Sequence, residues 1–251
     1  MREINVSQIV SIVRQLCIDS NYYLDTDVTD SIKQSLFTED SPVGKEILKQ
    51  MLYNARLAAE EQMPMCQDTG IAVVFLELGQ DVHIVGGDLF EGINEGVRQG
   101  YRDGYLRKSM VNDPAIERKN TNDNTPAVIH TEIVPGDGVK ITVAPKGGGS
   151  ENMSEVKMME PAQGIEGIKD FVVDRVGRSG GNPCPPIVVG VGIGGNFEEC
   201  ALLSKKALLR PLGTKNPDPK WAIVEEQLLE RINRLGIGPM GLGGRTTALA
   251  V

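Results

Sequence analysis

Apolar residues recur at every third or fourth position over about the first 60 residues of the chain. This spacing places them on one face of an amphipathic helix. It is found in three successive segments: Val6 to Cys17, Val28 to Leu36, and about Gly44 to Ala58. Pro64 follows the third segment and, because it lacks a backbone N–H, ends the helical pattern. The sequence therefore predicts a helical N-terminal part over about residues 1–62.

Beyond Pro64 the pattern changes to that of strands. An apolar run at 71–78 and a second segment at 81–85 are joined by Gly79 and Gln80, which favours a tight hairpin. The remaining predicted elements are a helix with Phe90, Ile93, Val97 and Tyr101, strands at about 127–134 and 138–145 flanking the turn 135–138, helices near 163–177, 196–210 and 220–235, and a strand near 186–193. Because helices and strands interleave, with hairpins as well as crossovers, we expect an α/β fold of the α+β type. Its sheet is predicted to be mixed, with the N-terminal helices and other helices packed around it.

Composition narrows the class of protein. Apolar residues make up 40% of the chain and charged residues 24%, as in soluble globular proteins. The net charge is −8, without the basic stripe of a nucleic-acid-binding protein. No signal-peptide pattern and no membrane-spanning run is present, and four cysteines are too few for a disulfide scaffold. We therefore predict a cytoplasmic protein with reduced thiols and neither a nucleic acid nor a membrane as partner.

The four cysteines differ in their predicted surroundings. Cys17 and Cys200 lie on predicted helices, where a small core residue is expected. Cys66 belongs to the segment Cys-Gln-Asp-Thr-Gly between a helix end and a strand, and Asp68 follows two residues later. Cys184 lies between prolines, which present a thiol rigidly. The two loop cysteines are candidate ligands or nucleophiles, and the alternative is that they are ordinary loop thiols.

Two glycine-rich segments and one arginine are further candidates. Lys146–Ser150 can turn backbone N–H groups toward an anion, or can be a flexible connection after a strand. Residues 190–195 match G-x-G-x-x-G between a strand and a helix, as in dinucleotide-binding oxidoreductases. That hypothesis lacks the full βαβ unit and an acidic residue ending the next strand. Arg107 either stabilises a helix C-terminus or binds a substrate carboxylate with its guanidinium fork.

Taken together, these motifs resemble a known family. The segments that carry the resemblance are Cys66–Gly70, Leu106–Ser109, Lys146–Ser150, Asn182–Pro186 and Gly192–Gly195, in this order. They closely resemble the alpha subunit of class I, iron–sulfur fumarate hydratase, and the L(+)-tartrate dehydratase alpha subunit shares the pattern. The resemblance covers nearly the whole chain, so residues 1–251 are interpreted as one iron–sulfur hydro-lyase alpha-subunit domain. The glycines at 190–195 then lose their nucleotide-binding meaning.

The resemblance implies a [4Fe-4S] cluster held by three cysteines, with one iron open to substrate. Cys66 and Cys184 match two of these ligands. The family's third cysteine lies beyond the Gly-Leu-Gly-Gly segment at 241–244, and this chain reaches Val251 without it. Cys200 is too close to Cys184, and is placed on a helix. We therefore expect this chain to bind a cluster weakly or not at all, and its ending within an apolar run suggests a truncated chain.

The resemblance also implies a dicarboxylate site. Gln67 and Asp68 match the segment that contacts substrate, Arg107 matches a carboxylate-binding arginine, and Gly148 and Gly149 match backbone that contacts a carboxylate. The implied reaction is the reversible hydration of fumarate to (S)-malate, with Asp68 and Arg107 as catalytic residues. L(+)-tartrate or methylfumarate are the alternative substrates, and a dinucleotide-binding oxidoreductase is a remote alternative.

A partner is implied as well. In the family a beta subunit, or a fused domain, brings the catalytic base and further cationic contacts, and this sequence has no segment resembling it. We therefore expect the chain to be inactive alone and to form its active site at the interface with a fumarate hydratase beta subunit. A different interpretation treats the chain as a non-catalytic scaffold that has lost its cluster site.

Overall fold

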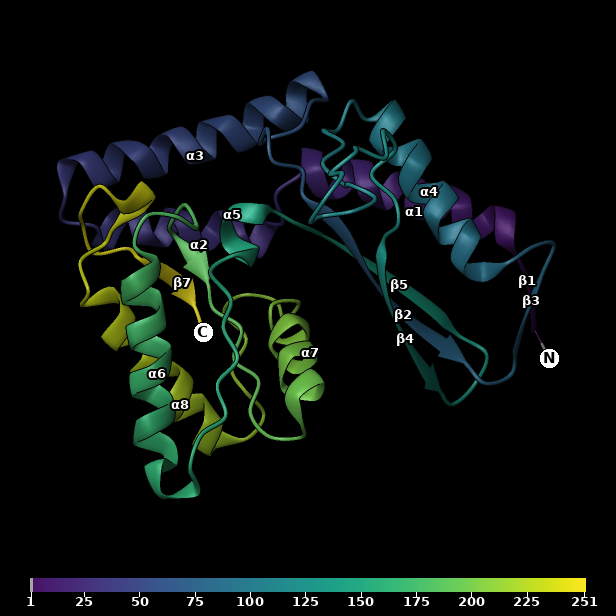
Figure 1. The fold of residues 1–251 in the computed structure, drawn as a ribbon. Helices are drawn as coiled ribbons and strands as arrows, with labels where there is room; N and C mark the ends of the chain where they lie inside the picture. Colours follow the sequence, from purple (N-terminus) through teal and green to yellow (C-terminus); the bar gives the residue numbers. More distant parts are fainter. Residues whose placement is uncertain (1) are drawn as a thin grey trace. The chain divides into compact units, whose positions relative to one another are not determined.

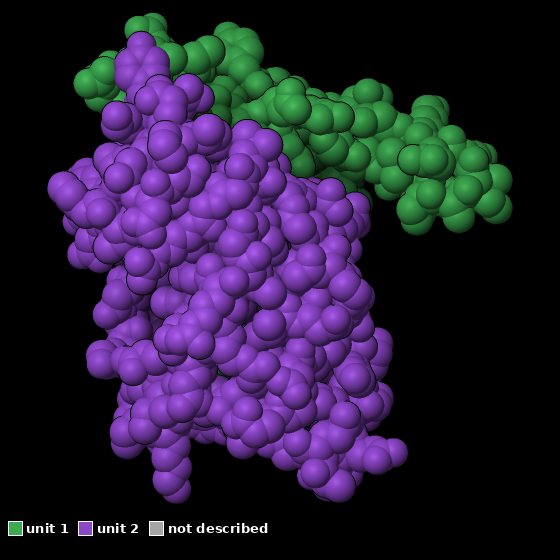
Figure 2. Space-filling model, turned by 90° about the vertical axis from the view of Figure 1, so that its left-hand side faces the viewer, with its two compact units in different colours: residues 1–24, 54–148 green, residues 25–53, 149–251 purple. Residues whose placement is uncertain are grey.

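The computed structural model of the protein describes residues 2–251, which divide into two compact units (Figures 1 and 2). Unit 1 holds the residues up to Leu24 and Asn54–Gly148, and unit 2 holds Asp25–Tyr53 and Gly149–Val251. The chain thus enters unit 2, returns to unit 1 and enters unit 2 again. Within residues 2–251, no helix has the length and apolar character needed to cross a membrane.

Unit 1 combines helices with a mixed sheet. Its elements are β1 (Arg2–Asn5), α1 (Val6–Tyr22), the C-terminal part of α3 (Pro42–Glu61), β2 (Ile71–Gly79), β3 (Val82–Val85), α4 (Leu89–Asp103), β4 (Val128–Val134) and β5 (Val139–Lys146). The larger sheet has the order β4-β2-β5, in which β2 is parallel to β4 and antiparallel to β5. Strands β1 and β3 form a separate parallel pair. The predicted α/β fold with a mixed sheet is confirmed.

The predicted hairpin of 71–78 and 81–85 is wrong. Strand β3 leaves β2 and pairs with β1, a short strand that the sequence pattern did not reveal. Instead, β2 lies between β4 and β5, and the turn at 135–138 passes across its end. The N–H of Gly79 donates to the carbonyl of Gly138 at 2.8 Å, and a Cβ at position 79 would lie 2.4 Å from the oxygen of Gly136. Glycine is therefore required where this turn crosses β2.

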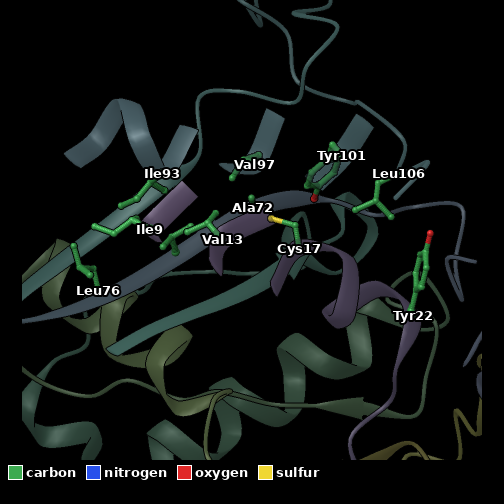
Figure 3. Packing of buried hydrophobic residues seen from close by; sticks show 11 residues of the cluster. Ile9, Val13, Cys17, Tyr22, Ala72, Leu76, Ile93, Val97, Tyr101 and Leu106 are labelled. Carbon is green, nitrogen blue, oxygen red and sulfur yellow. The ribbon is translucent and has the colours of Figure 1, made fainter. Parts of the chain in front are cut away.

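The core of unit 1 lies between two helices and the sheet (Figure 3). Alternate residues of β2 point to one side of the sheet, where α1 and α4 pack. The cluster includes Ile9, Val13 and Cys17 of α1, Ala72, Val74 and Leu76 of β2, and Ile93, Val97 and Tyr101 of α4. A Cβ at Gly96 of α4 would lie 2.8 Å from the carbonyl oxygen of Val10, so glycine lets the two helices approach closely. The spacing that predicted α1 and α4 is the spacing of this buried face.

Unit 2 is mostly helical. Its elements are α2 (Thr26–Thr38), the N-terminal part of α3, α5 (Gly148–Glu151, whose first residue belongs to unit 1), η1 (Pro161–Gln163), α6 (Gly164–Ser179), β6 (Ile187–Val188), α7 (Phe197–Ala207), α8 (Pro219–Asn233), η2 (Pro239–Gly241) and β7 (Ala248–Ala250). Val172 and Val176 of α6 pack with Leu228 and Ile232 of α8 in its core. Strands β6 and β7 are parallel.

The glycine-rich segment after β6 serves packing. The predicted strand at 186–193 is shortened to two residues, and the chain then runs against the backbone of α7. A Cβ at Gly190 would lie 2.1 Å from the carbonyl oxygen of Ser204, and one at Gly192 would lie 2.0 Å from that of Cys200. No larger residue fits at these positions without moving the backbone. Close packing on a helix therefore accounts for both glycines without a nucleotide.

Candidate functional site

The loop between α3 and β2 presents a thiol and a carboxylate from unit 1. Cys66 is exposed, and its Sγ accepts a hydrogen bond from the N–H of Asp68 at 3.4 Å. The Oδ1 of Asp68 accepts the N–H of Gly70 at 3.2 Å, which closes a tight local turn. Gly70 has φ +66°, and a Cβ there would lie 2.4 Å from the carbonyl carbon of Lys146. Glycine is therefore needed for the loop to pass so close to the end of β5.

Asp68 is joined to the glycine-rich segment. Its Oδ2 accepts the backbone N–H of Gly148 at 3.0 Å, and a Cβ on Gly147 would lie 3.0 Å from the same oxygen. The antiparallel register sets Ile71 opposite Lys146, so the residues before β2 and after β5 meet at one end of the sheet. The structure thus brings together Asp68 and Gly148, two residues singled out from the sequence. The Gly148 N–H, expected to contact a substrate carboxylate, donates here to a carboxylate of the protein itself.

Arg107 belongs to the same part of unit 1. It follows α4, which ends at Asp103 with Gly104 as its cap, so Arg107 does not end a helix as the sequence suggested. Its carbonyl oxygen accepts the hydroxyl of Thr69 at 2.9 Å, which ties its backbone to the Cys66 loop. Its guanidinium is exposed, and no ion pair or hydrogen bond of this side chain is found within residues 2–251. The side chain is therefore open to an anionic ligand.

Two buried residues that the sequence reasoning missed support these loops. The hydroxyl of Tyr101 donates to the carbonyls of Thr69 at 2.7 Å and Gly70 at 3.2 Å. Burial, together with nearby Cys17 and Asp68, raises the pKa of Tyr101, so the hydroxyl stays protonated as a donor. Asn124 is fully buried and also donates to the carbonyl of Gly70, at 3.1 Å. Residues 111–125 are polar, which is typical of a loop, but nothing in the sequence distinguishes Asn124 among them.

Unit 2 presents the second candidate thiol. Cys184 is exposed, has φ +56°, and donates its N–H to the carbonyl of Gly181 at 3.0 Å. The loop is fixed from its far side by the N–H of Met240, which donates to the carbonyl of Pro185 at 2.7 Å. Gly149, at the start of this unit, would place a Cβ 3.2 Å from the carbonyl oxygen of Asn182. Cys184 therefore lies in a loop of defined backbone shape, as its flanking prolines predicted.

The remaining cysteines are not equivalent to these two. Cys17 is buried, and burial raises its pKa to about 12, which confirms the expectation of a core residue. Cys200 is half-buried, so its assignment to the core is wrong. Its helix, α7, has no fully buried residue. Gln67 is exposed beside Cys66.

The potential metal ligands among the described residues do not form a metal centre by themselves. Within residues 2–251, no three His, Cys, Asp or Glu side chains are grouped so that they could hold a metal ion. The donor set found in each unit is one exposed thiol, Cys66 or Cys184, rather than a complete ligand set. In unit 1, the arrangement can bind and orient an anionic substrate with Arg107 and can exchange a hydrogen bond or proton at the Asp68 carboxylate.

Comparisons with known proteins cover nearly the whole chain. A family model described as fumarate hydratase (Fumerase) matches residues 10–251. A protein of Methanocaldococcus jannaschii, provisionally named L(+)-tartrate dehydratase subunit alpha, is 42% identical over 248 residues, which are 97% of this chain and 87% of that protein. The L(+)-tartrate dehydratase subunit alpha of Escherichia coli K12 is 35% identical over 257 residues, covering 100% of this chain and 84% of the relative. The protein of the same name from Shigella sonnei matches to the same extent.

Proposed function

The chain belongs to the fumarate hydratase (Fumerase) family of hydro-lyases, and from this premise we propose that it is the alpha subunit of a two-subunit enzyme that removes water from a hydroxydicarboxylate. The observation that carries the proposal is the arrangement in unit 1. There the Asp68 carboxylate is tied to the Gly148 backbone, the exposed Cys66 thiol accepts the Asp68 N–H, and the exposed Arg107 is tied to the same loop through Thr69.

These residues suit the chemistry of dehydration. A hydroxyl group leaves one carbon while a weakly acidic proton leaves the neighbouring carbon, which carries a carboxylate. Negative charge builds on that carboxylate as the proton departs, and a positioned guanidinium such as that of Arg107 stabilises it. The Asp68 carboxylate can accept a hydrogen bond from the substrate hydroxyl and so orient it. We propose Asp68 and Arg107 as catalytic residues, with Gln67, Gly148 and Gly149 as further substrate contacts.

The names of the relatives favour L(+)-tartrate as the substrate. Relatives of 35–42% identity over nearly the full chain carry that name, whereas the family model carries the name of fumarate hydratase. We predicted fumarate from the sequence motifs with tartrate as the alternative, and the comparisons support the alternative better. Tartrate and malate differ by one hydroxyl, and a site built to bind a hydroxyl discriminates strongly against the analogue that lacks it. We therefore propose L(+)-tartrate as the preferred substrate and (S)-malate/fumarate as the second candidate.

The residues present do not complete the set of thiolates that a [4Fe-4S] cluster of this family requires. Cys66 and Cys184 have the exposure that a ligand needs, and we propose them as two of the ligands. Cys17 is excluded by its burial and raised pKa, and Cys200 is half-buried on a helix. A full cluster therefore needs a third thiolate beyond the two exposed ones of residues 2–251, and the steps proposed for Asp68 and Arg107 involve only groups of this chain.

The proposed partner is a beta subunit. Its existence is suggested by the alpha-subunit names of the relatives. Within unit 1, the exposed Arg107 offers one cation, and a dicarboxylate has a second carboxylate that needs its own cation. We propose that the beta subunit supplies it, together with the base that takes the carbon-bound proton. The chain alone is then expected to bind substrate weakly and to be inactive.

The proposal is tested with the alpha–beta complex purified and assayed under anaerobic conditions. We expect formation of oxaloacetate from L(+)-tartrate, with a kcat/KM at least tenfold above that for hydration of fumarate, and no turnover by the alpha chain alone. A higher kcat/KM for fumarate would reverse the order of the two substrates. Absence of turnover with L(+)-tartrate, (S)-malate and fumarate would refute the proposed activity, and full activity of the alpha chain alone would refute the need for a partner.

A further inference from the structure

Asn124 joins three segments of unit 1 through one side chain. We propose that Asn124 is a positioning residue that sets the Asp68 carboxylate in register with Arg107. The inference rests on the proposed function, because it assigns a role in the same site to a residue that touches neither substrate nor reacting atoms. It concerns the polar loop 111–125, whose residues the proposed function leaves without a role.

The amide of Asn124 uses both of its ends. Nδ2 donates to the carbonyl of Gly70 at 3.1 Å, and Oδ1 accepts the N–H of Ser109 at 2.8 Å and that of Met110 at 3.3 Å. Gly70 lies two residues after Asp68, and Ser109 lies two residues after Arg107. Asn124 has 0% exposure, so these hydrogen bonds form away from solvent, and a partner left without the amide bears a desolvation cost. The two segments are therefore held together by this planar amide, beside the direct hydrogen bond from the Thr69 hydroxyl to the Arg107 carbonyl.

Asparagine is the residue that position 124 requires. Its backbone has φ +63°, in the left-handed region that asparagine tolerates better than most residues. Its side chain must donate at one end and accept at the other, which aspartate, an acceptor only when ionised, cannot do. Leucine has a similar volume but neither function. The conformation and the two hydrogen-bonding demands thus select the same residue.

The loop that carries Asn124 is itself fixed to a rigid helix. The Asp123 carboxylate accepts Nε of Arg98 at 3.0 Å and also accepts the N–H of Thr125 at 3.0 Å. Arg98 projects from α4 and is held in turn by Glu95 on the same helix. Asn124 is therefore presented from α4, the helix whose Tyr101 hydroxyl also donates to the Gly70 carbonyl. The Asn124 amide on the loop and the Tyr101 hydroxyl on α4 thus both donate to the carbonyl oxygen of Gly70.

Loss of the amide donor is expected to impair catalysis more than folding. The Gly70 carbonyl retains Tyr101 as a donor, whereas the link from Gly70 to Ser109 is broken. Asp68 and Arg107 then keep their own chemistry and the Thr69 hydrogen bond, but lose one of the two ties that fix their separation. Misplacement by about 1 Å can cost on the order of 100-fold in rate. The effect should appear in kcat as well as in KM, because substrate carboxylate and hydroxyl must be oriented together.

The test compares Asn124→Asp, which keeps the size and the Oδ1 acceptor, with Asn124→Ala in the alpha–beta complex. Asn122→Ala is the matched control, because Asn122 lies on the same loop, is exposed and also has a positive φ. We expect N124D to lower kcat/KM for L(+)-tartrate by about 100-fold, with an unchanged far-UV spectrum and a Tm within a few degrees of the wild type. N122A should match the wild type within about twofold.

A second readout does not depend on turnover. Cys66 belongs to the loop that Asn124 fixes, so N124D should change the rate of Cys66 alkylation by iodoacetamide relative to that of Cys184, which serves as the internal reference. Wild-type kinetics and wild-type alkylation in N124D would overturn the inference. Failure of both variants to fold would also overturn it, in favour of a purely structural role. An inactive wild-type complex would instead refute the proposed function, while the alkylation ratio would still decide the role of Asn124.

Discussion

The Oδ2 atom of Asp68 accepts the backbone N–H of Gly148 at 3.0 Å, so the carboxylate that precedes β2 is bonded to the chain that follows β5. The contact joins two predicted site residues that lie 80 positions apart in the sequence. A carboxylate oxygen is thus already held where a substrate carboxylate was expected to meet the glycine-rich backbone. We infer that the positions of the Asp68 carboxylate and of this backbone are coupled, so a change in either should affect the other.

Gly147→Ala tests the coupling between Asp68 and the glycine-rich segment without removing any functional group. A Cβ at position 147 would lie 3.0 Å from Oδ2 of Asp68 and would force the carboxylate to move by a few tenths of an ångström. We expect kcat/KM of the alpha–beta complex to fall by about 10- to 100-fold, since rate is sensitive to sub-ångström placement. Gly138→Ala is the control, because a Cβ there meets nothing within 4 Å. Equal activities of the two variants would contradict the coupling of Asp68 to the glycine-rich segment.

Arg107→Ala should lower substrate affinity with little effect on stability. The guanidinium is exposed and has no ion-pair partner within residues 2–251, and such substitutions usually change the free energy of unfolding by less than about 0.5 kcal/mol. A lost hydrogen bond to a charged group costs about 1.5–3 kcal/mol, which corresponds to about a 10- to 150-fold loss of kcat/KM. Arg107→Lys should recover part of it, because lysine keeps the charge but not the bidentate fork. Steady-state kinetics of R107A, with Lys119→Ala as the control, measure this loss. Wild-type kinetics for R107A would exclude a substrate contact.

The helices of the fold could be predicted because burial on one face is recorded in the spacing of apolar residues. Helix α1 and helix α4 show this plainly through Ile9, Val13, Ile93 and Val97, which lie in one core cluster. The partners of the strands could not be predicted in the same way. Whether β2 pairs with β3 or inserts between β4 and β5 depends on long-range contacts, and β1 is too short and polar to show a pattern. The hairpin prediction failed for this reason.

The residues of the candidate site also differ in whether the sequence could predict them. Cys66, Asp68 and Gly148 could be singled out because a thiol, a carboxylate and clustered glycines are unusual residue types at element junctions. Asn124 could not, because its partner Gly70 is 54 residues away and contributes only a backbone carbonyl. Every residue has a backbone carbonyl group, so the sequence does not show which carbonyl a buried side chain will bind. Buried polar residues that bind backbone are recognised only when the fold is known.

Glu39 makes the stability of unit 2 dependent on pH. Its carboxylate has 0% exposure and accepts the N–H groups of Ser41 at 2.9 Å, Arg245 at 2.8 Å and Thr246 at 2.7 Å. Burial by itself would raise the pKa of Glu39, but these backbone donors outweigh it and lower the pKa from 4.5 to about 2. A lowered folded-state pKa stabilises the protein above the unfolded-state pKa, and this stabilisation is lost as the pH falls from about 4.5 toward 2. At about 1.4 kcal/mol per pKa unit, the loss is on the order of 3 kcal/mol.

Urea unfolding of the wild type and of Glu39→Gln between pH 7 and pH 3 measures this contribution. The glutamine variant should be less stable than the wild type at pH 7 by about 2–3 kcal/mol, because its amide NH₂ faces backbone donors. The difference should shrink as the pH falls, since the wild type then loses its own ionised carboxylate. Glu46→Gln, on the exposed face of α3, should unfold like the wild type at every pH. If E39Q and the wild type are equally stable at pH 7, the carboxylate does not stabilise the loop at 245–246.

The thiols should react with iodoacetamide in the order of their exposure. Cys66 and Cys184 are exposed and are expected to be alkylated within minutes at pH 8, and the half-buried Cys200 more slowly. Cys17 has a pKa raised to about 12 by burial, so its thiolate fraction at pH 8 is about 10⁻⁴ and it should react only after unfolding. Peptide mass spectrometry over a time course gives the four rates. Modification of Cys17 in the folded chain would contradict its place in the core of unit 1.

The exposed thiols also set how much cluster this chain can bind. Anaerobic reconstitution with Fe²⁺ and sulfide should give well below one [4Fe-4S] cluster per chain, because within residues 2–251 the two exposed thiols are Cys66 and Cys184 and the family's cluster needs three cysteines. Iron and sulfide content should fall further in Cys66→Ser and in Cys184→Ser but not in Cys17→Ser. Cys200→Ser is the decisive variant, because the half-buried Cys200 is the remaining thiol that could approach a cluster. A stoichiometric cluster in the wild type that is lost in C200S would make Cys200 the third ligand and refute the expectation of weak binding.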